Sequence, residues 1–250
     1  VVPDSGCGSW LWEPQSTNLI TYSEDASQGI LSNCTVQSGF VSPSGELTAY
    51  KLVEDSSNSI KLFRAINNSA TVPNTSYSSS IFVKKGERTK VRVYGYQLTN
   101  QNFYVDYDLT DNSYLGSGQQ NAQVDGYFIE DIGGNGWKRI TIIGQKNASY
   151  SWDVGVSPLN DNGDVTYQGD GTSGLYIWGA QLEQQSYATS YIPTNGEANG
   201  VTRNQDVCTN GGSLASINST EGVLYAEIAA LADDGTTRII SLSDGTTANR

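Results

Sequence analysis

Short segments of alternating apolar and polar residues, separated by turns, run through most of this chain and limit what it can fold into. From Thr89 to Gln97, for example, Val91 and Val93 alternate with Tyr94 and Tyr96. A period of two is typical of a β-strand with one buried face. About ten such segments follow one another at spacings of roughly 8–15 residues, which predicts an all-β fold, an antiparallel β-sandwich of the jelly-roll kind.

The composition agrees with this fold class. The 250 residues include 15 Tyr, and Thr, Val and Ile are plentiful, all of which suit a pleated, half-buried surface. No apolar stripe recurs at helical spacing, and no stretch approaches the ~18 consecutive apolar residues that span a bilayer. We therefore expect no membrane insertion.

Charge and residue usage exclude several classes of function. The chain has no His and only three Cys, so Ser-His-Asp catalysis, Cys-His catalysis and a Cys/His zinc site cannot be built from it. The formal net charge is -12, whereas binding to nucleic acid needs clustered Lys and Arg. Carboxylate pairs are inevitable among 26 Asp and Glu and are not diagnostic of a glycosidase. We predict that the chain is not an enzyme and does not bind nucleic acid.

Shifts in composition predict four parts. Residues 1–16 form an N-terminal arm, 17–193 the sandwich, 194–220 a polar, Gly-rich linker, and 221–250 the beginning of a second β domain. Two strands alone are marginal in water. We therefore expect either that the chain continues beyond residue 250 or that this last segment pairs with another chain.

The arm contains one apolar cluster, in which Trp10 and Trp12 share a face if the arm is extended. We expect both rings to dock against the sandwich or against a neighbouring subunit. A pair of Trp rings that stacks on a sugar is the alternative.

Two acidic turns suggest a site for a structural calcium ion. The sequence indicates no other cofactor. Asp161, Asp164 and Asp170 supply hard oxygen ligands in tight turns, and Ca²⁺ takes six to eight such oxygens. Asp side chains that bond to their own turns explain the same residues without any metal, and this alternative stays open.

Aromatic side chains interleaved with Asn, Gln and Asp suggest a glycan-binding face. The predicted set is Tyr94, Tyr96, Tyr104 and Trp152, whose flat rings would stack on sugar rings. Tyr and Trp are also enriched in subunit interfaces and in cores, so both alternatives remain.

The three cysteines, Cys7, Cys34 and Cys208, match no metal template in their spacing. We expect all three to be free, as in a protein made in a reducing cytoplasm, with a Cys7–Cys34 bridge as the main alternative.

Three segments, in the same order, resemble a module of tailed-phage fibre, tailspike and appendage proteins. They are Glu13–Asp25 (EPQSTNLITYSED), Ile129–Arg139 (IEDIGGNGWKR), and Gly169–Glu183 (GDGTSGLYIWGAQLE) followed by SYATSYIPT at 186–194. Residues 221–250 are similar, more weakly, to the start of a concanavalin/laminin-G-like domain. The resemblance implies a jelly-roll, carbohydrate-binding-module-like domain and a homo-oligomer, commonly a trimer. It carries no catalytic motif.

The expected function is therefore that of a non-enzymatic virion structural protein, made in the host cytoplasm. Its partners would be other copies of itself, other virion proteins and a cell-surface polysaccharide. One alternative is a carbohydrate-binding module of a secreted bacterial polysaccharide-degrading enzyme. Another is a bacterial adhesin or extracellular filament subunit. Both alternatives would be extracellular.

Overall fold

A computed structural model of the chain describes residues 11–96, 102–147 and 151–207. The chain divides into two compact units, residues 1–205 and 206–250. Apart from residues 206 and 207, the second unit lies outside the described residues, and so does the predicted second β domain. The first unit is the sandwich.

The described residues form sixteen strands and one 3-10 helical turn, η1 (Ala26–Gln28). The strands are β1 (Ser16–Asn18), β2 (Ile30–Ser32), β3 (Cys34–Phe40), β4 (Ala49–Glu54), β5 (Asn58–Ile60), β6 (Leu62–Ala65), β7 (Tyr77–Lys85), β8 (Lys90–Tyr96), β9 (Asn102–Asp108), β10 (Tyr114–Gln120), β11 (Ala122–Ile132), β12 (Trp137–Lys146), β13 (Asp153–Leu159), β14 (Thr166–Gln168), β15 (Gly174–Glu183) and β16 (Val201–Arg203).

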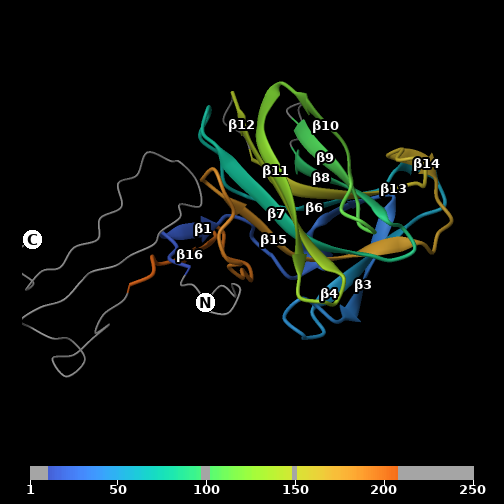
Figure 1. Cartoon of the computed structure of the whole chain (residues 1–250), viewed down its shortest axis with the longest axis horizontal. Coiled ribbons are helices and arrows are strands. Elements are labelled where there is room, and N and C mark those ends of the chain that lie inside the picture. Colours follow the sequence, from blue (N-terminus) through green and yellow to red (C-terminus); the bar gives the residue numbers. More distant parts are fainter. Residues whose placement is uncertain (1–10, 97–101, 148–150, 208–250) are drawn as a thin grey trace, which may run out of the picture. The chain divides into compact units, whose positions relative to one another are not determined.

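Twelve of these strands form two six-stranded antiparallel sheets that pack face to face (Figure 1). The first sheet has the order β10-β9-β8-β13-β6-β2 and the second β11-β12-β7-β15-β4-β3. Two small pairs, β1-β16 and β14-β5, flank the sheets. The predicted all-β, antiparallel sandwich is confirmed.

Alternation along the strands places the core between the sheets. On β8, Val91 and Val93 have no exposed surface, and on β9 the same is true of Phe103 and Val105. Their partners in the second sheet, such as Ile140, are equally buried. Each fully buried side chain of this size stabilises the fold by about 1.5–3 kcal/mol relative to exposure.

Seven of the described strands were not expected from the sequence. Five of them, β1, β2, β5, β14 and β16, are only three residues long, and β3 and β10 are the two longer ones. β3 and β10 are edge strands, each at the end of a sheet, and polar or small residues occupy both of their faces. Because neither face is continuously buried, these strands lack the alternation that marks β8 and β9. β11 is also longer than expected, since only its part from Tyr127 to Glu130 was predicted.

The predicted linker over residues 194–220 needs correction, because its first part belongs to the sandwich. The Thr194 amide donates to Ser23 Oγ at 2.8 Å, and Asn195 forms a β-bridge with Tyr22. β16 then pairs with β1. The polar, Gly-rich residues therefore belong to a segment that returns along the sandwich and is hydrogen-bonded to it. We call residues 186–203 the return segment, and the unit extends to residue 205.

Cys34 is free and buried, and its thiol approaches the Leu62 carbonyl oxygen at 3.4 Å. Burial raises the pKa of this thiol to about 11. Cys7 and Cys208 lie outside the described residues. Within the described ranges, no helix has the length and apolar character that crossing a bilayer requires.

Candidate functional site

The outer face of the first sheet carries the predicted tyrosines. On β8, Arg92, Tyr94 and Tyr96 point away from the core because they alternate with the buried valines. Tyr104 and Asp106 do the same on β9, which is the neighbouring strand. The predicted grouping of Tyr94, Tyr96 and Tyr104 on one face is therefore observed.

Arg92 covers the ring of Tyr104. Its guanidinium carbon lies 3.6 Å from the ring centre, and its Nε and Nη2 each donate to Asp106 at 2.7 Å. The ring itself lies across Gly118 of β10, where an added Cβ would lie 2.7 Å from ring atoms. The missing side chain of Gly118 lets the ring lie close to the sheet, and the charged Arg92, paired with Asp106, stacks on it.

The other two rings are fixed in a similar way. Tyr94 lies against Gly155 of β13 and is only 8% exposed. Tyr96 meets Tyr94 edge to face, with ring centres 5.9 Å apart, and Arg64 lies 4.9 Å from its ring centre. Arg64 is itself paired with a carboxylate across β6 and β13. The face is therefore a packed layer of tyrosines and of arginines paired with carboxylates, with Tyr96 and Tyr104 half-buried.

Trp152 does not belong to this face, which corrects the prediction that grouped it with the tyrosines. It has no exposed surface and packs between the sheets against Phe103, with ring centres 4.8 Å apart. Period two along this segment places it on the side of Val154 and Val156, both of which are buried. That signal was present in the sequence.

A buried amine lies beside this tryptophan. Lys146 is 2% exposed, and its Nζ lies 4.5 Å from the Trp152 ring centre. Among the residues that the structure describes, neither Lys146 Nζ nor Trp152 Nε1 has a hydrogen-bond partner. Burial lowers the pKa of Lys146 to about 7, and the negative charge of Asp153 acts in the opposite direction. Nothing in the sequence pattern marked Lys146.

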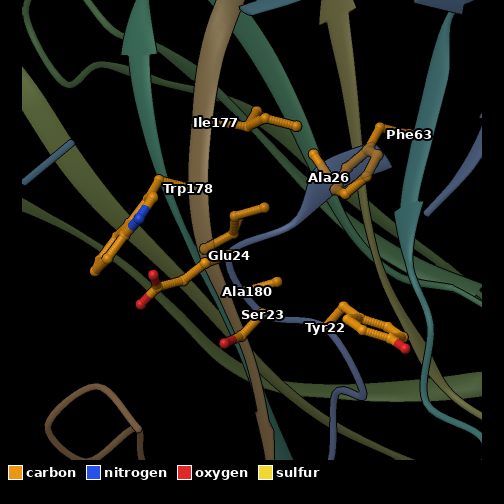
Figure 2. Close-up of a pocket in the computed structure, with 9 residues that line it drawn as sticks. Tyr22, Ser23, Glu24, Ala26, Phe63, Ile177, Trp178 and Ala180 are labelled. Atoms are coloured by element: carbon orange, nitrogen blue, oxygen red, sulfur yellow. The ribbon is translucent and has the colours of Figure 1, made fainter. Parts of the chain in front are cut away.

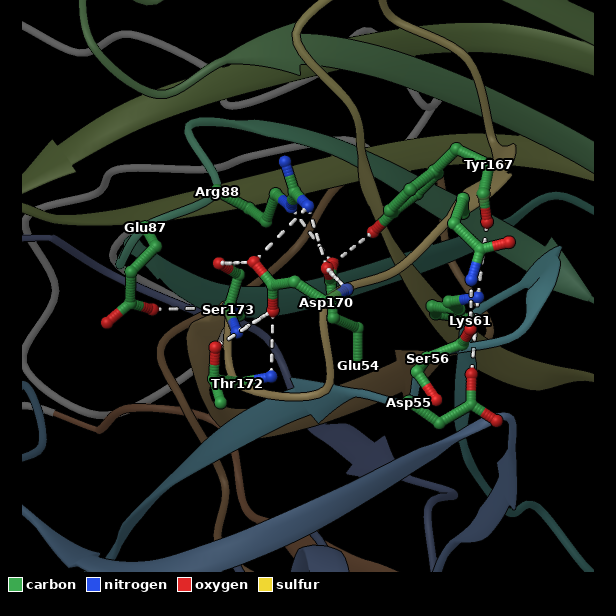
Figure 3. A network of polar contacts seen from close by, with 12 residues as sticks. Glu54, Asp55, Ser56, Lys61, Glu87, Arg88, Tyr167, Asp170, Thr172 and Ser173 are labelled. Carbon is green, nitrogen blue, oxygen red and sulfur yellow. Dashed lines mark hydrogen bonds and ion pairs between the residues drawn. The ribbon is translucent and has the colours of Figure 1, made fainter.

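The Asp170 carboxylate accepts hydrogen bonds from its own loop and lies 3.9 Å from the Arg88 guanidinium (Figure 3). Its Oδ1 accepts from the amides of Thr172 and Ser173, both at 2.7 Å, and its Oδ2 accepts from Ser173 Oγ. These hydrogen bonds hold the pKa of Asp170 far below its ordinary value. This is the Asp-turn geometry that was left open as the alternative to calcium.

Asp161 and Asp164 lie in a different turn, between β13 and β14. One carboxylate oxygen of Asp164 accepts from Asn160 Nδ2 at 3.0 Å, and the Asp164 amide donates to Asn160 Oδ1 at 2.7 Å. In the part of the chain that the structure describes, no three His, Cys, Asp or Glu side chains are grouped as a metal site would require. Calcium binding stays a prediction.

The Asp170 loop packs on a buried carboxylate that the sequence did not reveal. Glu54 accepts from Arg88 Nε at 2.9 Å, Arg88 Nη2 at 2.7 Å and Tyr167 Oη at 2.6 Å (Figure 3). The Asp170 amide adds a further bond at 2.9 Å. Burial acts to raise the pKa of Glu54, but these donors outweigh it, so the pKa lies below its ordinary value.

The two parts of the motif that carries the closest resemblance, YIWGAQLE and ATSYIPT, contact each other. The ring centres of Trp178 and Tyr191 lie 4.5 Å apart. Gln181 Oε1 accepts from the Ile192 amide at 2.7 Å. Gly179 has a φ of +63°, and a Cβ there would lie 2.9 Å from the Phe82 ring. These residues fasten the return segment onto the second sheet.

A hollow beside this segment is small (Figure 2). Its volume is about 10 Å³, and it is lined by Glu24 and Trp178 on one side of β15 and by Ile177 with Phe63 on the other. A second hollow near Gln28 and Asn68 measures about 70 Å³. Sites for small molecules usually enclose about 300–1,000 Å³. Burial raises the pKa of Glu24.

The arm is described only from residue 11 onward, so Trp10 lies outside the described residues. Trp12 is 51% exposed. Its docking against another subunit stays a prediction. Glu13, by contrast, is buried and accepts from the Ser190 amide at 2.7 Å.

No protein-family model matches the chain, and comparison with curated proteins finds no relative.

Proposed function

We propose that this chain is a non-enzymatic structural module of a tailed-phage virion, a subunit of a fibre or appendage. The observation that carries the proposal is that the residues resembling the phage-fibre module hold the fold together. Trp178, Gly179, Gln181 and Tyr191 hold the return segment on the second sheet.

The tyrosine face also favours a scaffold. Tyr94 is nearly buried, Trp152 is internal, and the Tyr104 ring is covered by Arg92. Side chains locked by neighbours lose little further entropy when a partner packs on them. Such a packed, charge-balanced layer suits contact with another copy of the chain or with another virion protein.

Sedimentation of the purified full chain tests this proposal. A trimeric mass that resists mild denaturant supports a virion fibre or appendage. A monomer that binds polysaccharide supports a module of a secreted enzyme. End-to-end polymers support an adhesin or filament subunit. Turnover of any polymer by the chain would contradict all three.

Attachment to a host-surface glycan is the second candidate, and the half-buried ring of Tyr96 favours it. Tyr96 lies beside Arg64, whose charge is balanced by a carboxylate. This setting suits a neutral sugar. We expect Tyr96→Ala to reduce retention of the protein on a polysaccharide column. Tyr114→Ala is the matched control, because Tyr114 is half-exposed but lies opposite the buried Tyr107 and stacks on Tyr127 of the second sheet.

Calcium is proposed only as a structural ion at the turns that contain Asp161, Asp164 and Asp170. A calcium titration followed by thermal melting tests this. A melting temperature that does not change with calcium would remove the ion from the account.

A further inference from the structure

The two connections of the sandwich to the flanking chain lie side by side. β1 and β16 are antiparallel, and Ser16 is opposite Arg203 (Figure 1). The chain that precedes Ser16 and the chain that follows Arg203 therefore leave this pair at the same end. Paired strands of this kind are only ≈ 4.5–5.5 Å apart between opposite Cα atoms.

Five side chains form what we call the clasp: Glu13, Ser16, Glu183, Thr189 and Arg203. Arg203 forms an ion pair with Glu13, and the same Glu13 accepts from the Ser190 amide. Glu183 accepts from Ser16 Oγ at 2.6 Å and from the Thr189 amide at 3.0 Å.

The clasp lies where β15 ends. Ser16 bonds to Glu183, the last residue of β15, and the Leu19 amide donates to the Leu182 carbonyl oxygen at 2.8 Å. The clasp thus joins the incoming chain, the end of β15 and the outgoing chain. Its two carboxylates are both buried, which makes these bonds stronger than exposed ion pairs of the same length.

The opposite end of the sandwich carries a different set of connections, which we call the tip. Lys84 is opposite both Trp137 and Tyr176, and Lys90 is opposite both Asp108 and Leu159. These registers place five connections together at the tip: 86–89, 109–113, 133–136, 160–165 and 169–173. β15 starts just after the last of them and runs ten residues to the clasp.

We propose that the flanking chain holds the module at one end, and that the clasp couples its two flanking segments. The tip then points away from the point of attachment, and a pull on either segment loads the clasp before it loads the sheets. This inference concerns the sandwich alone and holds whether or not the chain is a virion protein.

Distances between pairs of spin labels in the full chain test the proposal. Cys7 and Cys208 are replaced by Ser, and buried Cys34 is kept. One label pair is placed at Gln15→Cys and Asn204→Cys, which flank the clasp. The other pair is placed at Gln15→Cys and Asn162→Cys, which lie at opposite ends. All three positions are exposed.

We expect the 15/204 pair to give a short, narrow distance and the 15/162 pair to be longer by about 30 Å, the length of a ten-residue strand. Equal distances for the two pairs would overturn the single-ended mounting.

Glu13→Gln should broaden the 15/204 distribution and leave the 15/162 mean unchanged. Glu46→Gln, at an exposed carboxylate, is the matched control and should change neither. A 15/204 distribution that Glu13→Gln leaves narrow would overturn the coupling role of the clasp.

Discussion

The Nζ atom of Lys146 lies 4.5 Å from the centre of the Trp152 indole ring, in the interior of the sandwich, and none of the described residues forms a hydrogen bond with it. Burying an ammonium group in this way costs free energy, and the aromatic face offsets only part of it. The lowered pKa of Lys146, about 7, is the consequence.

Lys146 should make stability depend on pH above neutrality. The unfolded chain keeps this lysine protonated up to its ordinary pKa of 10.5, whereas the folded chain releases the proton near pH 7. Because the unfolded state then binds more protons, the free energy of unfolding should rise as pH rises from about 7 to 10.5. Urea unfolding at a series of pH values measures this.

Lys146→Met should remove that pH dependence and stabilise the protein at pH 7, by on the order of a few kcal/mol. The exposed Lys85→Met is the control and should leave the slope unchanged. If Lys146→Met lowers stability at pH 7, the amine has a partner that its geometry does not reveal.

Arg88→Met should destabilise the tip strongly. The substitution leaves the Glu54 carboxylate buried and without its two guanidinium bonds, for which we expect a loss of about 3–5 kcal/mol. Tyr167→Phe removes one hydrogen bond to the same carboxylate and should cost about 1–3 kcal/mol. Lys85→Met, in the same turn region, should change the denaturation midpoint little. Equal midpoints for Arg88→Met and Lys85→Met would contradict the role given to Glu54.

Gly179→Ala tests the return segment. The left-handed φ and the close Phe82 ring both oppose a Cβ, so we expect a loss of about 1–3 kcal/mol in the free energy of unfolding. Gly134→Ala is the control, because a Cβ there meets nothing within 4 Å and its φ is not in the left-handed region. Thermal melting of the two variants should separate them clearly, and a shared melting temperature would show that the close approach is unimportant.

Cys34 should be unreactive in the folded protein. Its thiol is buried and its pKa is raised to about 11, so little thiolate is present at neutral pH. A Cys7→Ser, Cys208→Ser variant should therefore react with a maleimide reagent only after unfolding. Rapid labelling under native conditions would show that the strands around Cys34 open.

Much of the strand pattern could be predicted because alternation is a local property. Val91 and Val93 face inward and Tyr94 and Tyr96 outward, as expected, and the Gly133–Gly136 turn precedes β12 as predicted. The edge strands β3 and β10 were not predicted, because a strand at a sheet edge need not have one continuously buried face. For Trp152, the alternation with Val154 indicated a place in the core. The prediction of a glycan-binding role relied instead on its polar neighbours in sequence, and these do not determine which way a side chain points.

The sequence by itself determined which residues are extended and which side of each strand is apolar, since a strand turns successive side chains to opposite faces. Only the tertiary structure decided the order of strands within each sheet, and with it every long-range partner. Glu54 meets Tyr167 across 113 residues, and Glu13 meets Arg203 across 190. No local pattern encodes such pairs, because they form only when the sheets pack and bring distant strand ends together.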